Sequence, residues 1–478
     1  MTEPDSRTTA SSDTPSDPRD RLPRVLGLGD ASLLIVASVV GSGIFFTPAQ
    51  VAGLLPGAEW ILMAWIVGAL ISLAGAFTNA ELGAMFPHAG GDYVYLREGL
   101  HPAAGFLVGW LSFFAIYTGT IAALAVVFAE SLAPALGLER LGVIGLSALV
   151  ILICSLLNLR GTRWGASLNN LTSGTKILAL AVFVLIGPLL GEGSFAPWQA
   201  GAAGIADASR GGWLSFGQAL SPILFSYLGW NACVYVASEI EEPTRNVPRS
   251  LFLGLAICTA LYLAVNIVYF YALTPSELRG SVDAGEAAAR SLFGPVGARW
   301  VSAFVLVSVL GTLNATVLVG PRIVYAMALD GMFLRRMDRI HEGFQTPSGA
   351  IGVQALVSIA LVVFLESFPR ALDFTVFGIV LATSADTIAL FALRLRDPDR
   401  ARPYRAWGYP WVPGLYGVAN GAIAVAMLIG NPLECLLSVG MLAAGLPFYA
   451  FFVAGRRPTG QNAEPGSENE PTEPPFDD

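Results

Sequence analysis

Residues 36–47 read Val-Ala-Ser-Val-Val-Gly-Ser-Gly-Ile-Phe-Phe-Thr. They place Gly41, Ser42 and Gly43 in the middle of an apolar run that is long enough to cross a bilayer. A glycine is about 1 kcal/mol less favourable than alanine inside a helix, so two glycines around a serine weaken the helix here. We therefore predict that a membrane span at 30–53 is interrupted at Ser42.

A second glycine-containing polar patch interrupts the apolar run at 216–240. It reads Ser226-Tyr227-Leu228-Gly229-Trp230-Asn231. Gly41 comes 11 residues after Asp30, where the first run begins, and Leu228 comes 12 residues after Phe216, where the second begins. A helix rises about 1.5 Å per residue, so both patches should lie roughly 17–18 Å deep, near the middle of the bilayer.

The two patches occupy equivalent positions in two halves of the chain. The second comes five spans after the first, so one span would enter the bilayer from the cytoplasm and the other from outside. This predicts an inverted repeat of five plus five helices, at about 30–190 and 216–394, with helices 1 and 6 discontinuous. Unwound backbone in lipid leaves N–H and C=O groups without hydrogen-bond partners, and each such group costs several kcal/mol of free energy. Both breaks should therefore line a cavity or contact a ligand.

Composition extends this interpretation to the whole chain. The 478 residues are 54% hydrophobic and 13% charged, whereas about a quarter of a soluble chain is charged. We predict an all-α polytopic membrane protein and exclude a soluble enzyme and an outer-membrane barrel. No basic patch indicates nucleic-acid binding, and no cysteine spacing indicates a metal site. Twelve transmembrane helices are expected, near 30–53, 58–84, 103–130, 141–159, 166–190, 216–240, 249–273, 298–328, 349–366, 372–394, 411–431 and 433–455.

Basic residues set the predicted orientation, because loops rich in Lys and Arg stay in the cytoplasm. With the N-terminus inside, the cytoplasmic segments near the spans carry 18 of these residues and the outer loops carry six. We expect a multi-pass protein of the cell (plasma or inner) membrane with both termini cytoplasmic. Its membrane domain would cover 25–455, between disordered tails at 1–24 and 456–478 that are rich in Pro, Ser, Thr and acids.

The predicted break in the first span suits a zwitterion. The half-helix that begins near Ile44 would offer free N–H groups and a positive dipole end, which suit a carboxylate. Carbonyl groups left unpaired before this break and in the second break suit an ammonium group. An α-amino acid carries both charges a short distance apart. The alternative is that the small residues serve only close helix packing.

Lys176 is the one lysine among 27 basic residues, and it lies ten residues into the span at 166–190. An ionisable side chain at this depth is expensive and is by default a functional candidate. A compact ammonium fits where a bulky guanidinium would not, which predicts a specific site for this charge. The alternative is a lysine whose head extends to the membrane interface.

Acids are rare in the predicted spans. Those inside or at the edge of a span include Glu81, Glu130, Glu239 and Asp386. None of them is predicted to carry protons. Where the sixth span ends, we expect a gate or a surface ion-pair network from Glu239, Glu241, Glu242, Arg245 and Arg249.

Four motifs resemble those of the amino acid-polyamine-organocation (APC) superfamily, and within it bacterial permeases similar to L-type amino acid transporters. The likeness covers about residues 24–455. The motifs are Gly41-Ser42-Gly43-Ile44-Phe45; Phe225 to Asn231, continuing to Glu239 and 243–249; Gly311-Thr312-Leu313-Asn314 with Arg322 and 326–331; and Arg402-Pro403-Tyr404-Arg405 with Gly408-Tyr409-Pro410.

The resemblance implies a leucine-transporter-like fold, with helices 11 and 12 outside the repeats. Residues 41–44 would bind the substrate's α-carboxylate, and the backbone at 225–229 would bind its α-amino group. Phe225 would act as an aromatic gate, and Lys176 would replace a sodium ion between helices 1 and 8. The implied substrate-binding set is Gly41, Ser42, Gly43, Ile44, Phe225, Ser226, Tyr227, Gly229 and Asn231.

Two features depart from L-type relatives. Leu228 stands where many of them have glycine, so a preference for large substrates is not carried over. The outer loop near 131–140 has no cysteine, so no disulfide-linked accessory subunit is expected.

These observations predict a sodium-independent permease that moves α-amino acids across the membrane by alternating access, through exchange or proton coupling, with no cofactor. A polyamine or organocation exchanger is an alternative, although it should place acids facing the breaks. A receptor that binds an amino acid without moving it is another alternative. An intramembrane enzyme is not favoured, because no Ser/His, His/Glu or Cys/His set lies inside the spans.

Overall fold

The computed structural model describes residues 22–198, 212–364 and 368–454. Within these ranges the chain is helical, and its β-structure is one isolated bridge between Leu26 and Ile240. Most of the predicted tails lies outside the described residues. The helices are α1 (Leu28–Val39), α2 (Gly43–Leu54), α3 (Ala58–Met85), α4 (Asp92–Gly99), α5 (Pro102–Leu111), η1 (Ser112–Tyr117), α6 (Thr118–Leu136), α7 (Arg140–Leu159), α8 (Thr162–Leu190), α10 (Trp213–Ser226), α11 (Ala232–Tyr235), η2 (Ala237–Glu239), α12 (Pro243–Ala272), α13 (Pro275–Gly280), α14 (Ala284–Val319), α15 (Pro321–Leu329), η3 (Arg335–Asp338), α16 (Ser348–Phe364), α17 (Phe368–Arg396), α18 (Trp411–Gly430) and α19 (Pro432–Ala454).

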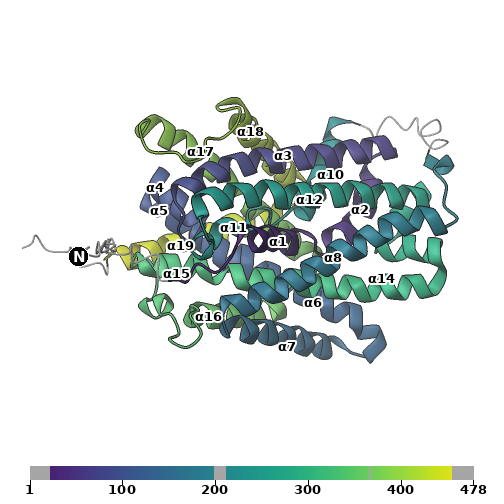
Figure 1. Ribbon diagram of the computed structural model, residues 1–478, viewed down its shortest axis with the longest axis horizontal. Helices are drawn as coiled ribbons and strands as arrows, with labels where there is room; N and C mark the ends of the chain where they lie inside the picture. Colours follow the sequence, from purple (N-terminus) through teal and green to yellow (C-terminus); the bar gives the residue numbers. More distant parts are fainter. Residues whose placement is uncertain (1–21, 199–211, 365–367, 455–478) are drawn as a thin grey trace, which may run out of the picture.

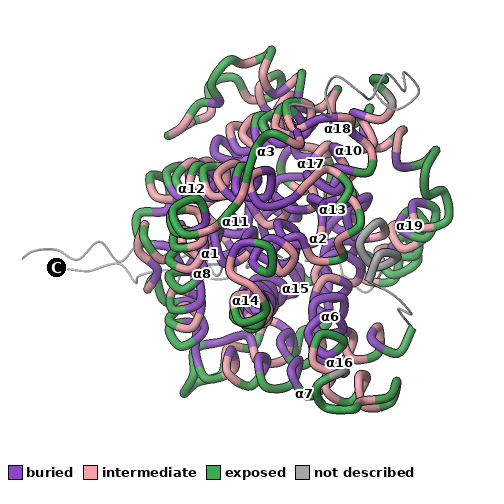
Figure 2. Tube along the Cα trace, turned by 90° about the vertical axis from the view of Figure 1, so that its right-hand side faces the viewer, coloured by how far each residue is buried: buried purple, intermediate pink, exposed green. Residues whose placement is uncertain are grey.

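The described helices form a bundle with an apolar exterior. Nine of them are long and apolar enough to cross a membrane, or ten when the bent pair α1 and α2 counts as one span. Figure 1 shows the long helices running along the long axis of the molecule, and Figure 2 shows buried residues at its centre. Leu141 of α7, Leu185 of α8 and Leu415 of α18 are among many large apolar side chains that stay exposed. Such an exterior suits lipid, and the predicted all-α, multi-pass membrane protein is confirmed.

The interruption predicted at Ser42 is present. α1 ends at Val39 and α2 begins at Gly43, and the two helices bend by 46° at this point. A Cβ atom at Gly41 would lie 2.9 Å from Thr312 Oγ1, and one at Gly43 would lie 2.7 Å from Ser226 Cα. Close neighbours on α14 and α10, as well as the break itself, therefore require glycine here.

The second interruption follows α10. Residues 227–231 form turns in which Gly229 has a φ of +92°, a conformation that favours glycine. The prediction of helix up to residue 240 is wrong after this break, because α11 has four residues and η2 has three. The backbone there bonds to another segment instead: Glu239 O accepts from Val25 N and Leu26 N.

Two other spans are less regular than predicted. The span at 103–130 contains the six-residue π-helix η1 between α5 and α6. π-helical turns are rare in proteins, and those that occur are often at functional sites. The span predicted at 298–328 begins earlier, at Ala284, and kinks at Gly294, where φ is +71° before Pro295. The π-helix leaves an apolar run intact, so the hydrophobic pattern does not reveal it, whereas Gly294-Pro295 is a helix-breaking pair that is visible in the sequence.

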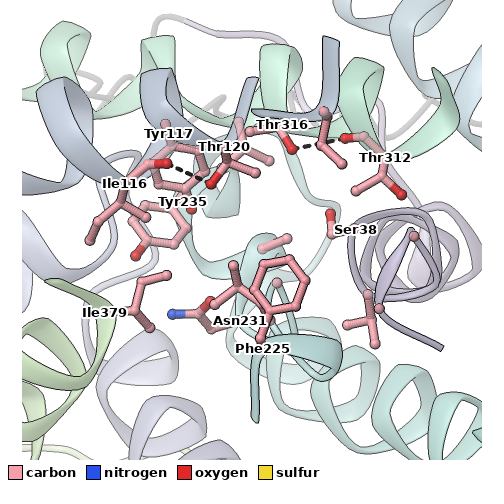
Figure 3. Close-up of a pocket in the computed structure, with 18 of the residues that line it drawn as sticks. Ser38, Ile116, Tyr117, Thr120, Phe225, Asn231, Tyr235, Thr312, Thr316 and Ile379 are labelled. Carbon is pink, nitrogen blue, oxygen red and sulfur yellow. Dashed lines mark hydrogen bonds between the residues drawn. The ribbon is translucent and has the colours of Figure 1, made fainter. Parts of the chain in front are cut away.

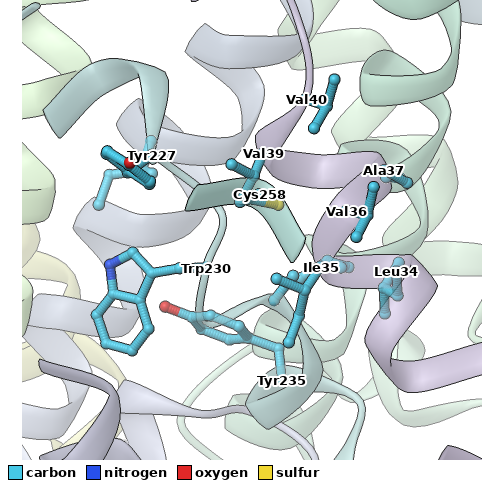
Figure 4. Packing of buried hydrophobic residues seen from close by; sticks show 14 of the residues in the cluster. Leu34, Ile35, Val36, Ala37, Val39, Val40, Tyr227, Trp230, Tyr235 and Cys258 are labelled. Carbon is cyan, nitrogen blue, oxygen red and sulfur yellow. The ribbon is translucent and has the colours of Figure 1, made fainter. Parts of the chain in front are cut away.

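Most of α1 is buried, and it packs against α8, α12 and α14; it lies in the middle of the view in Figure 1. Gly254 of α12 allows its close approach, since a Cβ atom there would lie 2.7 Å from Ile35 Cβ. Figure 4 shows Val39 of α1 beside Cys258 of α12, with Tyr227 of the second break nearby in the same buried cluster. The packing of α12 against α1 therefore holds both breaks in the buried centre.

Candidate functional site

A cavity lies between the two breaks. Its volume is about 70 Å³, and one water needs about 10–15 Å³ by this measure, so it holds several waters or a small molecule. Its walls come from both breaks and from α4, η1, α6, α14 and α17. Figure 3 shows Phe225 and Asn231 of the second break on one side and Thr120, Thr312 and Thr316 across from them.

The beginning of α2 offers free donors at this cavity. Gly41, Ser42 and Gly43 line it. The N–H groups of Ser42, Gly43 and Ile44 have no acceptor among the described residues, as is usual in the first turn of a helix. With the positive end of the helix dipole, these groups can bind a carboxylate.

The second break offers free acceptors. The carbonyl oxygens of Tyr227 and Leu228 have no donor in the described part of the chain, and Leu228 lines the cavity. An ammonium group can bind such oxygens. Two other carbonyls at the breaks are already bonded, because Tyr262 Oη of α12 donates to Val39 O at 2.8 Å and to Ser226 O at 2.9 Å. Tyr262 thus joins the last turn of α1 to the last turn of α10.

The structure brings most of the predicted substrate-binding residues together. Those that line the cavity are Gly41, Ser42, Gly43, Phe225, Gly229 and Asn231.

The other three predicted residues lie beside the cavity. Ile44 is buried, and its carbonyl accepts from Tyr269 Oη at 3.2 Å. Ser226 Oγ bonds to Thr47 Oγ1 at 2.8 Å, while the ring of Tyr227 packs edge-on against Trp65. These contacts fix the two breaks in place.

Lys176 lies behind the first break, away from the cavity lining. Its side chain is fully buried, and Nζ donates to Ala37 O of α1 and to Thr312 Oγ1 of α14, both at 3.0 Å. The lysine head does not extend to an interface. One ammonium group therefore joins α8 to the end of α1 and to α14, and Thr312 itself lines the cavity.

Sequence reasoning missed Asp92 and Tyr235, which both line the cavity. Asp92 begins α4 and is 2% exposed, and it is the one charged side chain among the described lining residues. Tyr235 Oη donates to Asp92 Oδ2 at 2.6 Å. Asp92 directly follows Gly90 and Gly91, which have positive φ angles, but two glycines before a carboxylate do not by themselves indicate burial.

Of the two alternatives expected here, a gate or a surface ion-pair network, the surface network does not include Glu239. Glu242 and Arg245 form an exposed pair at 3.6 Å, as predicted. Glu239 is fully buried and pairs instead with Arg322 of α15 at 2.8 Å, while Thr162 Oγ1 donates to its other oxygen at 2.5 Å. The turn at η2 directs the carboxylate into the bundle.

Comparison with known proteins agrees with this architecture. A family model described as amino acid permease matches residues 26–459. The chain belongs to this amino acid permease family. It is similar to the serine/threonine exchanger SteT of Bacillus subtilis (strain 168), at 32% identity over 439 residues that cover 90% of this chain and 96% of that protein. It is 27% identical over 448 residues to the human large neutral amino acids transporter small subunit 2, covering 90% and 80%. It is also 27% identical over 439 residues to the b(0,+)-type amino acid transporter 1 of Oryctolagus cuniculus, covering 90% and 88%.

Family membership confirms the resemblance predicted from the four motifs. The permease relatives match over nearly the whole membrane domain, so the chain is a membrane transport protein and not an enzyme.

Proposed function

We propose that this permease moves α-amino acids across the cell membrane by alternating access and without sodium. The observation that carries the proposal is the cavity between two helix breaks, with free N–H groups at the start of α2 and free carbonyl oxygens at Tyr227 and Leu228. A zwitterion satisfies both sets at once. The serine/threonine and large neutral amino acid relatives support a neutral substrate.

The proposed architecture has twelve spans. The proposed spans are the nine long helices, the bent pair α1–α2 and two further candidates. These candidates are α10 with its continuation α11, and the shorter apolar helix α16. Two five-helix inverted repeats at about 30–190 and 216–394 would place the breaks face to face, with α18 and α19 outside the repeats. The excess of arginine in alternate loops supports cytoplasmic termini.

The substrate pose follows from the free polar groups. The carboxylate would accept from the N–H groups of residues 42–44, and the ammonium would donate to the carbonyls of Tyr227 and Leu228. Phe225 would cover the bound molecule, and Asn231 would bond to its polar atoms. The small volume and the side chain of Leu228 favour amino acids with short side chains.

Lys176 is our reason for proposing sodium independence. Its ammonium donates to a carbonyl of α1 and a hydroxyl of α14, and oxygens of these two kinds can also bind a sodium ion. A tethered positive charge in this position would remove the need for a free cation.

Asp92 is the observation that favours an organocation exchanger, since it places one acid at the cavity. Its Oδ2 already accepts from Tyr235, and a dication would need more negative charge than one shared carboxyl provides. We therefore keep the amino acid as the proposed substrate. All four cysteines are buried, which supports a permease without a disulfide-linked partner.

Uptake into proteoliposomes tests the proposal. Labelled amino acids are offered to the purified full-length chain with and without sodium, with and without a pH gradient, and with and without internal amino acid; empty liposomes are the control. We expect uptake of short neutral amino acids that sodium does not change. Binding without flux would indicate a receptor, preferential uptake of polyamines would indicate the organocation exchanger, and no transport of any amino acid would contradict the proposal.

A further inference from the structure

A buried pair of carboxyl groups lies next to the cavity. Asp92 of α4 is 2% exposed and lines the cavity, and Asp386 of α17 is fully buried. Helix α4 packs against α17, and the two carboxyl groups act on each other's ionisation. Two neighbouring carboxyl groups in a buried site without a cation cannot both stay ionised, so such a pair keeps one proton.

The remaining contacts of the pair leave a place for that proton. Tyr235 Oη donates to Asp92 Oδ2 at 2.6 Å, and Asn79 Nδ2 donates to Asp386 Oδ2 at 2.9 Å. Each carboxyl thus has one oxygen engaged. The Oδ1 atoms of Asp92 and Asp386 have no N–H or O–H donor among the described residues. A shared proton is the donor that this arrangement lacks.

No arginine or lysine in the described ranges forms an ion pair with either carboxyl. The cations of neighbouring segments are engaged elsewhere, in the pairs Arg97–Asp330, Arg322–Glu239 and Arg394–Glu81. Burial raises the pKa of Asp92 above its ordinary value. The charge of the pair is therefore set by a proton and not by a salt bridge.

The neighbouring titratable groups are neutral near pH 7. Tyrosines and one cysteine face the pair and its partners: Tyr95 of α4, Tyr117 of η1, Tyr235 and Cys233 of α11, and Tyr416 of α18. Their ordinary pKa values are about 10 for tyrosine and about 8.5 for cysteine. The charged or titratable groups on the other packed elements are exposed, lie at helix ends or are bonded elsewhere: Glu81, Arg97, Glu98, His101, Glu130, Arg394, Arg396 and Glu434.

Two tyrosines connect the pair to the cavity. Tyr117 and Tyr235 both line it, with ring centroids 5.3 Å apart. Figure 3 shows them together at one end of the cavity. The hydroxyl of Tyr235 therefore connects the cavity to Asp92. Because Tyr235 belongs to α11 and Asp386 to α17, the same contacts join the second break to α17.

We propose that Asp92 and Asp386 form a proton-binding site that couples amino acid movement to proton movement. The proposal rests on the proposed function and selects proton coupling within it. The pair takes one proton from water in the cavity, and the protonated pair holds α4, α11 and α17 together. When the proton leaves to water, two adjacent carboxylates repel each other, and these elements separate.

The test compares wild type, Asp386→Asn and Glu130→Gln in proteoliposomes that contain a pH-sensitive dye. Asp386→Asn replaces the shared proton with an amide N–H that cannot be released. Glu130→Gln is the matched control, because it converts an exposed acid of α6 to an amide. Uptake of the labelled amino acid and internal acidification are measured from pH 5.5 to pH 8.5. Stabilisation against heat by the same amino acid is measured over this range as a readout that needs no flux.

We expect wild type and Glu130→Gln to carry protons with the amino acid and to vary at least several-fold in uptake with pH. Asp386→Asn should lose acidification, keep a lower but measurable exchange, and show the same stabilisation by substrate at every pH. A pH profile of stabilisation equal to wild type in Asp386→Asn overturns the proposal, even when that variant transports nothing. Wild-type uptake without proton movement or pH dependence overturns it and leaves the permease function intact, whereas absence of all wild-type transport overturns both.

Discussion

Among single residues, Lys176 should be essential to transport. We expect Lys176→Ala to lower initial uptake rates about 10- to 100-fold, because hydrogen bonds from a charged group are worth about 1.5–3 kcal/mol. Without the ammonium, Ala37 O and Thr312 Oγ1 lose their charged donor, and α1 and α14 are held less firmly. Uptake into proteoliposomes with equal protein content measures the loss.

Lys176→Arg should not restore this activity. The backbone of α14 passes so close that a Cβ atom at Gly311 would lie 3.1 Å from Lys176 Cε, which leaves no room for a guanidinium. Thr175→Ala is the matched control, since Thr175 is exposed on the same helix and its hydroxyl bonds to Leu171 O. Full transport activity of Lys176→Ala would contradict the proposal that the Lys176 ammonium takes the place of a sodium ion.

Gly43→Ala should destabilise the protein and slow uptake. The added Cβ atom would lie 2.7 Å from Ser226 Cα, so α2 and α10 must move apart. Overpacking of this kind costs about 1–3 kcal/mol, which thermal unfolding in detergent detects. Gly53→Ala in the same helix is the control, because nothing lies within 4 Å of its Cβ position. Equal unfolding temperatures for the two variants would contradict a tight contact at Gly43.

Sequence pattern could single out Gly43 and Lys176, because a glycine pair and a lone lysine stand out in an apolar background. It could not show that Gly43 faces Ser226, since tertiary packing alone brings those residues together. It also could not place Asp92 at the cavity. A carboxylate after two glycines between apolar runs resembles an ordinary loop residue until the fold buries it.

At the scale of helical elements, Tyr262 of α12 connects the two breaks. Its hydroxyl donates to Val39 O and Ser226 O, so Tyr262→Phe leaves two buried carbonyls with one partner fewer. We expect a loss of about 1–3 kcal/mol in stability and slower uptake. Tyr271→Phe is the matched control, because its hydroxyl bonds to Gly191 O at 3.0 Å from the end of the same helix. A larger loss in Tyr271→Phe would contradict the assigned role of Tyr262.

The positions of both breaks could be predicted, whereas the form of the chain after them could not. Glycine weakens a helix wherever it stands, so the break at Ser42 follows from local sequence. The short α11 and the turn at η2 depend on backbone bonds from Val25 and Leu26 to Glu239 O. These contacts join segments that are distant in the sequence, and the hydrophobic pattern carries no information about them.

At the scale of the whole molecule, Glu239 closes one end of the bundle. Its backbone binds the segment before α1, and its side chain binds Arg322 of α15 and Thr162 of α8. In the orientation that we propose from the arginine distribution, this end faces the cytoplasm. Any motion that opens the cavity to that side must therefore break or carry this buried ion pair with it.

Replacing one partner of this pair should be more harmful than replacing both. Glu239→Gln leaves Arg322 as a buried cation without a carboxylate, and breaking a buried pair costs about 3–5 kcal/mol. The double variant Glu239→Gln/Arg322→Met removes both charges, so its unfolding temperature in detergent should lie above that of either single variant. Its transport should still be altered, because the closed end is no longer held by charge. If the losses of stability of the two single variants simply add in the double variant, the two residues act independently. The closure of this end of the bundle would then be assigned to the backbone bonds of Glu239 with Val25 and Leu26.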